Sequence, residues 1–257
     1  MENALKAKLD SGKNVVGTFF EIGGTAAIEC LGLTGLDFMI IDTEHGPFDV
    51  ESAMEYIRVA ELHRITPLVR VKNHERSSIL KMLDVGAKGL VIPNIHTVEE
   101  VKEIVNHGKY APVGNRGFFL GRVAGYGYDI IAKEVPGYFS TCNRETMLIP
   151  QCETVGCLEN IETIAGMDGV DGIFVGPYDL SISMGMTAQF DHPLFIKALE
   201  RIVQACKDAE IPAFIFSGNS QGAKMHFDNG FQGVAINTDT SVYINAFKNI
   251  VAEVKNK

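Results

Sequence analysis

The sequence contains no tryptophan, no apolar run long enough to cross a bilayer and only five cysteines. Because a transmembrane helix needs about 20 consecutive apolar residues, we expect no role in a membrane. The cysteines are odd in number and show no CxxC spacing, which favours reduced thiols over a disulfide framework or a zinc site. The first residues, MENALKAKLDSGK, lack the apolar core of a signal peptide. We therefore expect a cytoplasmic protein.

Positive charge is also scarce, because 23 Lys and Arg residues stand against 32 Asp and Glu residues, for a formal net charge of -9. Nucleic-acid binding depends on clustered Lys and Arg that neutralise phosphates, so the composition argues against a nucleic-acid partner. A small anionic substrate stays compatible, since Arg and a metal ion can create a local positive field. The sequence also has no Walker A, HExxH or G-x-S-x-G motif. Its GNSQG segment is only a glycine-rich loop that could meet an anion.

Short β-branched or aromatic runs alternate with longer amphipathic segments along the whole chain. This alternation is typical of βα units and a parallel sheet. The runs predict strands at Val15–Glu21, Phe38–Asp42, Pro67–Val71, Gly89–Pro93, Tyr110–Arg116, Thr146–Cys152, Gly172–Val175, Ala213–Phe216 and Gly233–Asn237. The segments predict helices at Ala26–Leu33, Val50–His63, Glu75–Val85, Val98–Asn106, Gly156–Ala165, Pro193–Ala209, Ser220–Asn229 and Ser241–Val254.

These elements fit a closed (β/α)8 barrel, the TIM barrel, better than an open sheet. One strand is surplus, and Tyr110–Arg116 has the weakest pattern. No linker, low-complexity run or shift in charge marks a second domain, so we expect one α/β domain over residues 1–257. The longest irregular stretch, 114–144, is rich in glycine and aromatic residues, and a loop of that length is usually functional or disordered.

Reactive residues follow the second predicted strand, in the stretch MIIDTEHGPFD. The apolar run leads straight into Asp42, Glu44 and His45, and the chain then breaks at a Gly-Pro pair. In a barrel of parallel strands the active site lies at the carboxyl ends of the strands. Two carboxylates and an imidazole at such a position are costly to bury and useful to a catalyst.

Three further strand ends supply reactive side chains. PLVRV carries Arg70, the strand that begins near Met147 ends in Gln151 and Glu153, and GIFVGPYDLS ends in Asp179. Glu153 and Asp179 are one βα unit apart in such a barrel, so we expect their loops to be neighbours. Hard carboxylate ligands with few nitrogen or sulfur companions suit Mg²⁺ or Mn²⁺, with the remaining positions left to water and a chelating substrate.

Each of these residues also has an ordinary structural role open to it. Asp179 could be a helix N-cap, and Glu153 could be a charge on the barrel rim. Arg70 could be an ion-pair partner of Glu44, and His45 could be a hydrogen-bonded structural histidine. The occurrence of all of them at strand ends favours the catalytic interpretation.

These motifs resemble those of the class II, metal-dependent pyruvate aldolases, typified by 4-hydroxy-2-oxoheptanedioate aldolase and 2-dehydro-3-deoxyglucarate aldolase. The likeness covers nearly the whole chain and rests on DFMIIDTEHGPFD, PLVRV, KMLDVGAKGLVIPNI, PQCET and GVDGIFVGPYDLSISMG. The resemblance implies a TIM barrel and a divalent metal ion, Mg²⁺, Mn²⁺ or Co²⁺. It also implies cleavage of a 4-hydroxy-2-oxo acid to pyruvate and an aldehyde through a pyruvate enolate.

The resemblance assigns roles to individual residues. It implies that Glu153 and Asp179 bind the metal. It implies that Arg70 contacts the keto oxygen, and that His45, paired with Asp42, is the catalytic base. A base must remove the C4 hydroxyl proton, and an imidazole suits this task because it titrates near neutral pH. Asp42 would hold the tautomer of that imidazole.

Other residues would bind the oxo acid. Gln151 matches a polar residue beside it, and the backbone of Gly176, Pro177 and Tyr178 matches the segment that holds its carboxylate. The role of Glu44 is open: it could orient the arginine of PLVRV or a metal-bound water.

The resemblance also implies an assembly. Members of the family are hexamers, trimers of dimers, that exchange their last helix, and Asp84 of LDVG approaches the site of the neighbouring subunit. The chain departs from the family pattern at Tyr178, where GPAD is expected, and at Cys152, where many members have QIET. The loop 114–129 agrees only through GNRG and is then shorter, which leaves the acceptor aldehyde open.

Other reactions stay open on the residues alone. The same enolate site could serve oxaloacetate decarboxylation or the lysis of a malyl or citramalyl thioester, although the acidic chain shows no basic groove for the 3′-phosphate of coenzyme A. Lys72, near the end of the third strand, is a candidate for a Schiff-base mechanism. A non-catalytic barrel whose carboxylates stiffen the rim is the alternative from another class.

Overall fold

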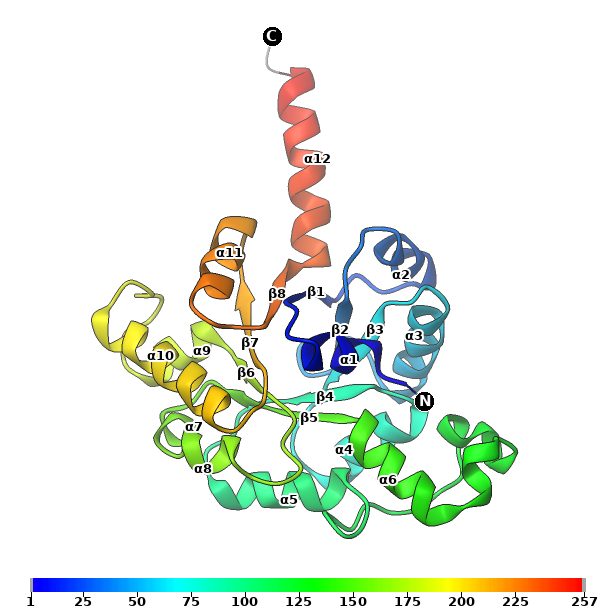
Figure 1. The fold of residues 1–257 in the computed structure, drawn as a ribbon. Coiled ribbons are helices and arrows are strands. Elements are labelled where there is room, and N and C mark those ends of the chain that lie inside the picture. Colours follow the sequence, from blue (N-terminus) through cyan, green and yellow to red (C-terminus); the bar gives the residue numbers. More distant parts are fainter. Residues whose placement is uncertain (1, 256–257) are drawn as a thin grey trace.

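The computed structural model describes residues 2–255 and shows a closed barrel of parallel strands with helices around it (Figure 1). The strands are β1 (Val15–Phe20), β2 (Phe38–Asp42), β3 (Thr66–Arg70), β4 (Gly89–Ile92), β5 (Met147–Cys152), β6 (Ile173–Val175), β7 (Ala213–Ser217) and β8 (Gly233–Thr238). Each strand pairs with the next in sequence, and β8 pairs with β1 to close the barrel. The predicted (β/α)8 barrel is thus confirmed.

The helices cover the outside of the barrel, apart from α1 and α12. They are α1 (Ala4–Asp10), α2 (Thr25–Gly32), α3 (Val50–Leu62), α4 (Arg76–Val85), α5 (Val98–Gly108), α6 (Val135–Glu145), α7 (Val155–Glu159), α8 (Ile161–Ala165), α9 (Pro177–Ser183), α10 (Pro193–Asp208), α11 (Ser220–Asp228) and α12 (Asp239–Lys255), with 3-10 turns η1 (Arg122–Gly127) and η2 (Ile130–Lys133). Of these, α1, α6 and α9 were not predicted from the sequence.

The alternation of side chains along the strands divides the core into two layers. Side chains such as Phe38 and Phe214 fill the barrel interior, where their rings meet edge to face at 6.0 Å. Neighbours in sequence such as Ile41 and Val69 pack between the strands and the helices. Because both faces of the strands are packed, the backbone at the strand ends is held rigidly.

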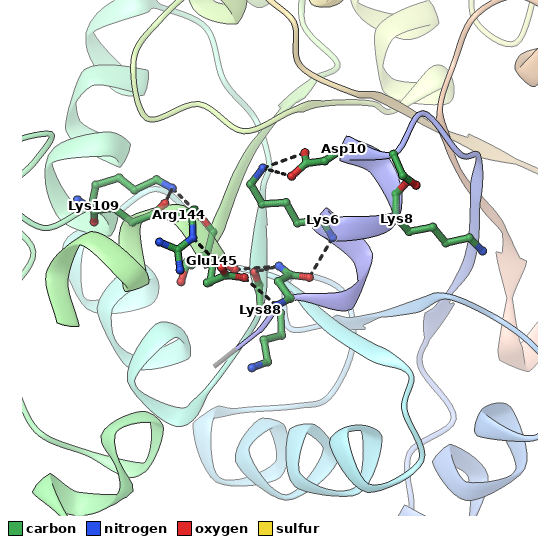
Figure 2. A network of polar contacts seen from close by, with 11 residues as sticks. Lys6, Lys8, Asp10, Lys88, Lys109, Arg144 and Glu145 are labelled. Carbon is green, nitrogen blue, oxygen red and sulfur yellow. Dashed lines mark hydrogen bonds and ion pairs between the residues drawn. The ribbon is translucent and has the colours of Figure 1, made fainter. Parts of the chain in front are cut away.

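The helix α1 closes the end of the barrel at which the strands begin. Its Leu5 and Leu9 side chains are buried in the barrel interior. Before the helix, the Asn3 side-chain amide donates to the backbone carbonyls of Lys88 at 3.0 Å and Glu145 at 2.9 Å, and Figure 2 shows these two residues beside α1. The open mouth of the barrel therefore lies at the opposite end, where the strands finish.

The strand predicted at Tyr110–Arg116 is wrong, because this segment is a loop. The N–H groups of Val113 and Gly114 both donate to the carbonyl of Tyr110, at 3.2 and 3.1 Å, so the backbone turns back on itself. Pro112 has no N–H to donate to a neighbouring strand, which disfavours a place inside a sheet. With this candidate removed, eight strands remain for the eight positions.

Two other segments differ from the prediction. The helix expected at Gly156–Ala165 is broken into α7 and α8, which meet at Asn160 (φ −108°, ψ 13°). The side-chain amide of Asn160 donates to the carbonyl of Gly156 at 2.9 Å, a local bond that competes with helix continuation. The irregular stretch 114–144 contains η1, η2 and α6, and its buried side chains form a small hydrophobic cluster of their own with Tyr110.

The C-terminal helix α12 extends away from the barrel (Figure 1), and none of its described side chains is buried. Its large exposed apolar residues are Val242, Tyr243, Ile244, Phe247, Ile250, Val251 and Val254. An apolar surface of this kind is typical of a helix that another chain covers. The exchange of this helix between subunits stays a prediction.

Two findings bear on the environment of the chain. Residues 2–255 contain no disulfide bond. Within the same range there is no helix with the length and apolar character that a bilayer crossing requires.

Candidate active site

The ends of β2 and β3 lie side by side, and their register pairs Asp42 with Arg70. Arg70 donates to the two carboxylate oxygens of Asp42, through Nε at 2.9 Å and through a terminal nitrogen at 2.6 Å. The Asp42 side chain is fully buried, and the guanidinium also lies 4.8 Å from the centre of the Phe19 ring. A bidentate pair of this kind fixes the plane of the guanidinium. Arg70 is therefore held rigidly at the barrel mouth.

The expected pairing of the Asp42 carboxylate with the His45 ring is not what the structure shows. Besides Arg70, Asp42 accepts from the backbone N–H groups of Glu44 at 3.1 Å and His45 at 3.4 Å. The carboxylate beside the imidazole is that of Glu44, with 3.8 Å between its Oε2 and His45 Nε2. The His45 side chain is 72% exposed, so the imidazole lies at the rim of the mouth.

The turn after β2 depends on Gly46. A Cβ at this position would collide with the backbone carbonyl oxygen of Asp42, so only glycine lets the chain fold back this closely. The turn keeps Glu44 at the mouth, where its Oε2 lies 3.3 Å from a terminal nitrogen of Arg70.

Glu153 follows β5 and is only 8% exposed. Its Oε1 accepts from the backbone N–H of Asn94 at 2.6 Å, and its Oε2 accepts from the side-chain amide of Gln151. Burial, opposed by the Asn94 N–H and reinforced by the charges of Asp179 and Glu44, raises the pKa of Glu153 to about 7. This carboxylate is therefore buried near other negative charges, an arrangement that a bound cation would stabilise.

Asp179 lies in the first turn of α9, and it is Gly176 rather than Asp179 that caps the helix. A Cβ added at Gly176 would stand 2.7 Å from Glu153 Oε2 and 2.9 Å from the side-chain nitrogen of Gln151, so the start of α9 lies directly against Glu153. The exposed carboxylate of Asp179 is close enough for its charge to raise the pKa of Glu153. The ordinary role as an N-cap is thus excluded for Asp179.

A cavity of about 130 Å³ opens between these strand ends. It is lined by Phe19, Glu21, Arg70, Gln151, Phe174, Gly176, Pro177, Tyr178, Asp179, Phe216 and Thr238. The Oε1 atom of Gln151 is buried and has no hydrogen-bond partner in the structure. A buried acceptor without a partner is costly, so this atom is available to a ligand that brings a donor or a cation.

The electrostatics of the mouth are those of one guanidinium among carboxylates. Burial lowers the pKa of Arg70, but the hydrogen bonds and charge of Asp42 and the charge of Glu44 outweigh burial and raise it overall. Burial raises the pKa of Glu44; Arg70 and His45 act against this rise, and Asp42 and Asp179 add to it. Within residues 2–255, no three His, Cys, Asp or Glu side chains are grouped to hold a metal ion by themselves. A metal at this mouth would thus also need oxygens from water and substrate.

Two residues singled out from the sequence do not join the mouth of this chain. Asp84 lies in the last turn of α4 and pairs with Arg116 at 2.8 Å. Because α4 returns the chain towards the start of β4, Asp84 lies towards the opposite end of the barrel from the strand ends. Lys72 is 51% exposed and lies 3.7 Å from the carboxylate of Asp49.

Two residues of the mouth were missed from the sequence. Glu21 directly follows β1 in GTFFEIGG, so the rule that selected the other strand ends could have found it. Asn94 acts through its backbone N–H, in a left-handed conformation with φ 57°, and no side-chain pattern signals such a role.

Comparison with known proteins gives a consistent picture. A family model described as HpcH/HpaI aldolase/citrate lyase matches residues 16–246. The hydroxypyruvate/pyruvate aldolase of Roseobacter denitrificans is 32% identical over 255 residues, which cover 98% of this chain and 97% of that protein. The 4-hydroxy-2-oxo-heptane-1,7-dioate aldolase of Escherichia coli is 30% identical over 255 residues, which cover 98% of this chain and 95% of that protein.

The fold agrees with these similarities in sequence. The crystal structure of an HpcH/HpaI aldolase from Desulfitobacterium hafniense matches with a TM-score of 0.91 at 27% identity, and the match covers 98% of this chain and 97% of that one. The chain therefore belongs to the HpcH/HpaI aldolase/citrate lyase family and is a class II lyase of the pyruvate aldolase type.

Proposed function

We propose that this enzyme cleaves a 4-hydroxy-2-oxo acid between C3 and C4, to give pyruvate and an aldehyde through a pyruvate enolate. The observation that carries the proposal is the gathering of Glu153, Asp179 and Glu44 around Arg70 at the barrel mouth. The two relatives are both named as aldolases, which supports the same reaction class.

The residues at the mouth fit a divalent metal ion. Glu153 is buried near two other carboxylates, and Gln151 presents a buried oxygen that lacks a partner. We assign Glu153 and Asp179 as the protein ligands of Mg²⁺, Mn²⁺ or Co²⁺, which favour carboxylate oxygens and water. When bound, such an ion supplies Lewis-acid stabilisation of the negative charge that develops on the C2 oxygen.

Arg70 adds fixed positive charge to the same region. Its guanidinium is locked by Asp42 and packed on Phe19, so it needs no rearrangement when charge develops on the substrate. Preorganised donors of this kind are among the largest contributions to catalysis. We therefore assign Arg70 to the keto oxygen, and we assign Asp42 as the residue that positions Arg70.

The oxo acid itself is proposed to lie between β5 and α9. Gln151, Gly176, Pro177 and Tyr178 line the cavity there. The backbone of Gly176, Pro177 and Tyr178, at the start of α9, is assigned to the substrate carboxylate, and Gln151 is assigned to the polar edge of the oxo acid. Their placement follows from β5 and β6, whose register brings Gln151 beside Phe174 and so brings Gly176 beside Glu153.

His45 is proposed as the base that removes the C4 hydroxyl proton. Its exposed imidazole lies at the rim, where the aldehyde half of the substrate must enter and leave. Glu44 stands between this ring and Arg70, at 3.8 and 3.3 Å, so it can orient both groups. We assign Glu44, rather than Asp42, as the carboxylate that supports the base.

We further propose that α12 packs on a neighbouring subunit and that the enzyme is a cytoplasmic hexamer, a trimer of dimers. The apolar and wholly unburied surface of α12 supports the exchange. Asp84 would then lie near a neighbour's mouth rather than its own. Analytical ultracentrifugation of the enzyme tests this assembly: a hexamer is expected, and Phe247→Asp should shift it to smaller species.

The experiment that tests the proposed reaction is hydrogen exchange at C3 of pyruvate in D₂O, which reports enolate formation without any aldehyde. Exchange is expected with added Mg²⁺ or Mn²⁺, and it should be abolished by EDTA and fall steeply in Arg70→Ala. A borohydride-trapped pyruvate adduct that survives EDTA would instead indicate a Schiff base on a residue such as Lys72. Glu55→Gln, a substitution at an exposed site outside the mouth, is the control and should leave the exchange rate unchanged. Absence of metal-dependent exchange in the wild-type enzyme would refute the proposal.

Oxaloacetate decarboxylation tests the role of the base separately from the formation of the enolate. Loss of CO₂ from oxaloacetate forms the same enolate but needs no base at a C4 hydroxyl. His45→Ala should therefore lose aldol cleavage and retain most of its decarboxylation. Equal loss of both reactions would contradict the assignment of His45 as the C4 base.

A further inference from the structure

Glu21 is a carboxylate in the barrel mouth to which no role has yet been assigned. It follows β1 and lines the same cavity as Arg70, Gln151 and Asp179. Glu21 thus borders the space in which the oxo acid and its aldehyde half must lie. The question is what a negative charge does at this position.

Glu21 is held in place by the first residues of α12. The carboxylate of Asp239 accepts from the backbone N–H of Glu21 at 2.9 Å, and the hydroxyl of Thr240 donates to Glu21 Oε2 at 3.1 Å. A carboxylate can accept about four hydrogen bonds, so Glu21 keeps acceptor capacity for a ligand. Both its backbone and its charged group are therefore fixed before a substrate arrives.

The cavity offers no spare positive charge for a second anionic group. Of the described residues that line it, Arg70 is the only Lys or Arg, and its guanidinium is already engaged by Asp42 and lies 3.3 Å from Glu44. Two other arginines, Arg116 and Arg122, line a separate cavity of about 240 Å³.

Those two arginines are themselves paired with carboxylates of the chain. Arg116 binds Asp84 at 2.8 Å, and Arg122 binds Glu61. They are therefore not placed to neutralise a negative group in the mouth of the same barrel. In the proposed hexamer, Arg116 would approach a neighbour's mouth only together with Asp84, which already neutralises it.

Substrates of this reaction class differ in the charge of the aldehyde half. The E. coli relative is named for a heptane-1,7-dioate, a molecule with a carboxylate at each end. In the present chain, a second carboxylate that entered the mouth would meet Glu21 without a matching cation, and like charges placed together are strongly unfavourable. A hydroxyl group at the same place would instead donate a hydrogen bond to Glu21.

We propose that Glu21 is a specificity-determining residue that selects 4-hydroxy-2-oxo acids whose aldehyde half is uncharged and carries a hydroxyl group, and that excludes dicarboxylates. This inference rests on the proposed aldol cleavage and adds the class of substrate to it. Thr240 is the positioning residue that aims the Glu21 carboxylate.

The test compares two substrates that differ only at C5. One is 4,5-dihydroxy-2-oxopentanoate, which ends in a hydroxymethyl group, and the other is 4-hydroxy-2-oxopentanedioate, which ends in a carboxylate. Pyruvate release is measured with added Mg²⁺, and the ratio of the two kcat/KM values is the readout. The wild-type enzyme is expected to favour the hydroxymethyl substrate by at least about tenfold, because the C5 carboxylate of the other substrate would be repelled by the carboxylate of Glu21.

Three variants assign this preference to Glu21. Glu21→Gln keeps the shape and removes the charge, so the ratio should fall by about tenfold, mainly through faster cleavage of the dicarboxylate. Thr240→Val should lower the ratio by a smaller factor, and Thr240→Ser, which keeps the hydroxyl, should restore it. The exposed Glu55→Gln, which removes the same charge elsewhere, should leave the ratio unchanged.

Two results would overturn the inference: a wild-type ratio of one or less, or the same ratio in wild type and Glu21→Gln. Hydrogen exchange at C3 of pyruvate by the wild-type enzyme, which needs no aldehyde, separates this failure from that of the reaction itself. If exchange occurs but the ratio of the two kcat/KM values is one or less, or is the same in wild type and Glu21→Gln, only the role of Glu21 is overturned. Absence of exchange overturns the aldol reaction and, with it, the role of Glu21.

Discussion

The buried carboxylate of Glu153 makes a sharp prediction about how stability depends on pH in the metal-free protein. Its pKa is raised from the usual 4.5 to about 7, because burial and neighbouring negative charges disfavour the ionised form. Between these two values the unfolded chain ionises this group while the folded protein keeps it protonated. The folded state therefore binds more protons than the unfolded state, and the stability from this group is lost as pH rises from about 4.5 to 7.

The size of the effect follows from the shift. At about 1.4 kcal/mol for each pKa unit, the full effect is about 3 kcal/mol, of which about 2 to 3 kcal/mol falls between pH 5 and pH 8. Glu153→Gln has no ionisable group at this position, so it should not show this loss. The variant is expected to gain about 2 to 3 kcal/mol relative to wild type when the pH is raised from 5 to 8.

Urea denaturation in EDTA at pH 5 and pH 8 measures this difference directly. Other titrating groups, such as His226, whose pKa is lowered by burial, are present in both proteins and cancel in the comparison. Glu55→Gln, at an exposed site, should follow the wild type. If Glu153→Gln and wild type lost the same free energy between the two pH values, the account of a buried carboxylate among like charges would be refuted.

Other consequences follow from the same geometry. Arg70→Lys cannot keep the two bonds to Asp42, so kcat for pyruvate hydrogen exchange should fall by roughly 100- to 1,000-fold, and a fall of less than tenfold would contradict the role of the planar guanidinium. Gly176→Ala places a Cβ 2.7 Å from Glu153 Oε2; it should cost about 1 to 3 kcal/mol in urea denaturation and reduce the rise in Tm caused by Mn²⁺. Leu5→Ala should lower the free energy of unfolding by about 2 to 5 kcal/mol, because it opens a cavity where α1 packs into the barrel. It should leave the exchange rate unchanged, because α1 lies at the closed end of the barrel.

The fold was largely readable from the sequence because a parallel barrel repeats one simple pattern. Buried strands such as Phe38–Asp42 read as apolar runs bounded by turns, and this pattern needs no knowledge of distant contacts. The prediction of a strand at Tyr110–Arg116 was wrong for the same reason. The composition of this segment suits a strand, and only tertiary packing decides that it forms a loop. The helix α1 was missed because its seven residues bury just Leu5 and Leu9, too few to establish a period.

The site was predicted less completely, and the reason is a matter of register. The family resemblance implied a pair of Asp42 and His45, whereas Asp42 pairs with Arg70, which is 28 residues away and lies opposite it on β2 and β3. Residues in register on neighbouring parallel strands with the same orientation point to the same face, so this pair could have been found by aligning the two strand ends. The hydrogen bond from the Asn94 backbone N–H to Glu153 could not have been predicted from the sequence, because it depends on one loop conformation.

The charges at the mouth lead to a last prediction, about binding rather than turnover. At pH 8, above the raised pKa of Glu153, Asp42 already neutralises Arg70, and Glu44, Glu153 and Asp179 add negative charge around it. A 2-oxo acid brings one more negative charge, and two unit charges about 4 Å apart repel by about 4 kcal/mol at an effective dielectric constant of about 20. A divalent cation reverses this balance, so the metal-free enzyme should bind pyruvate at least about 100-fold more weakly than the Mn²⁺-loaded enzyme. Calorimetric titration with pyruvate measures both affinities; equal values would mean that Arg70 alone provides enough positive charge to hold the oxo acid.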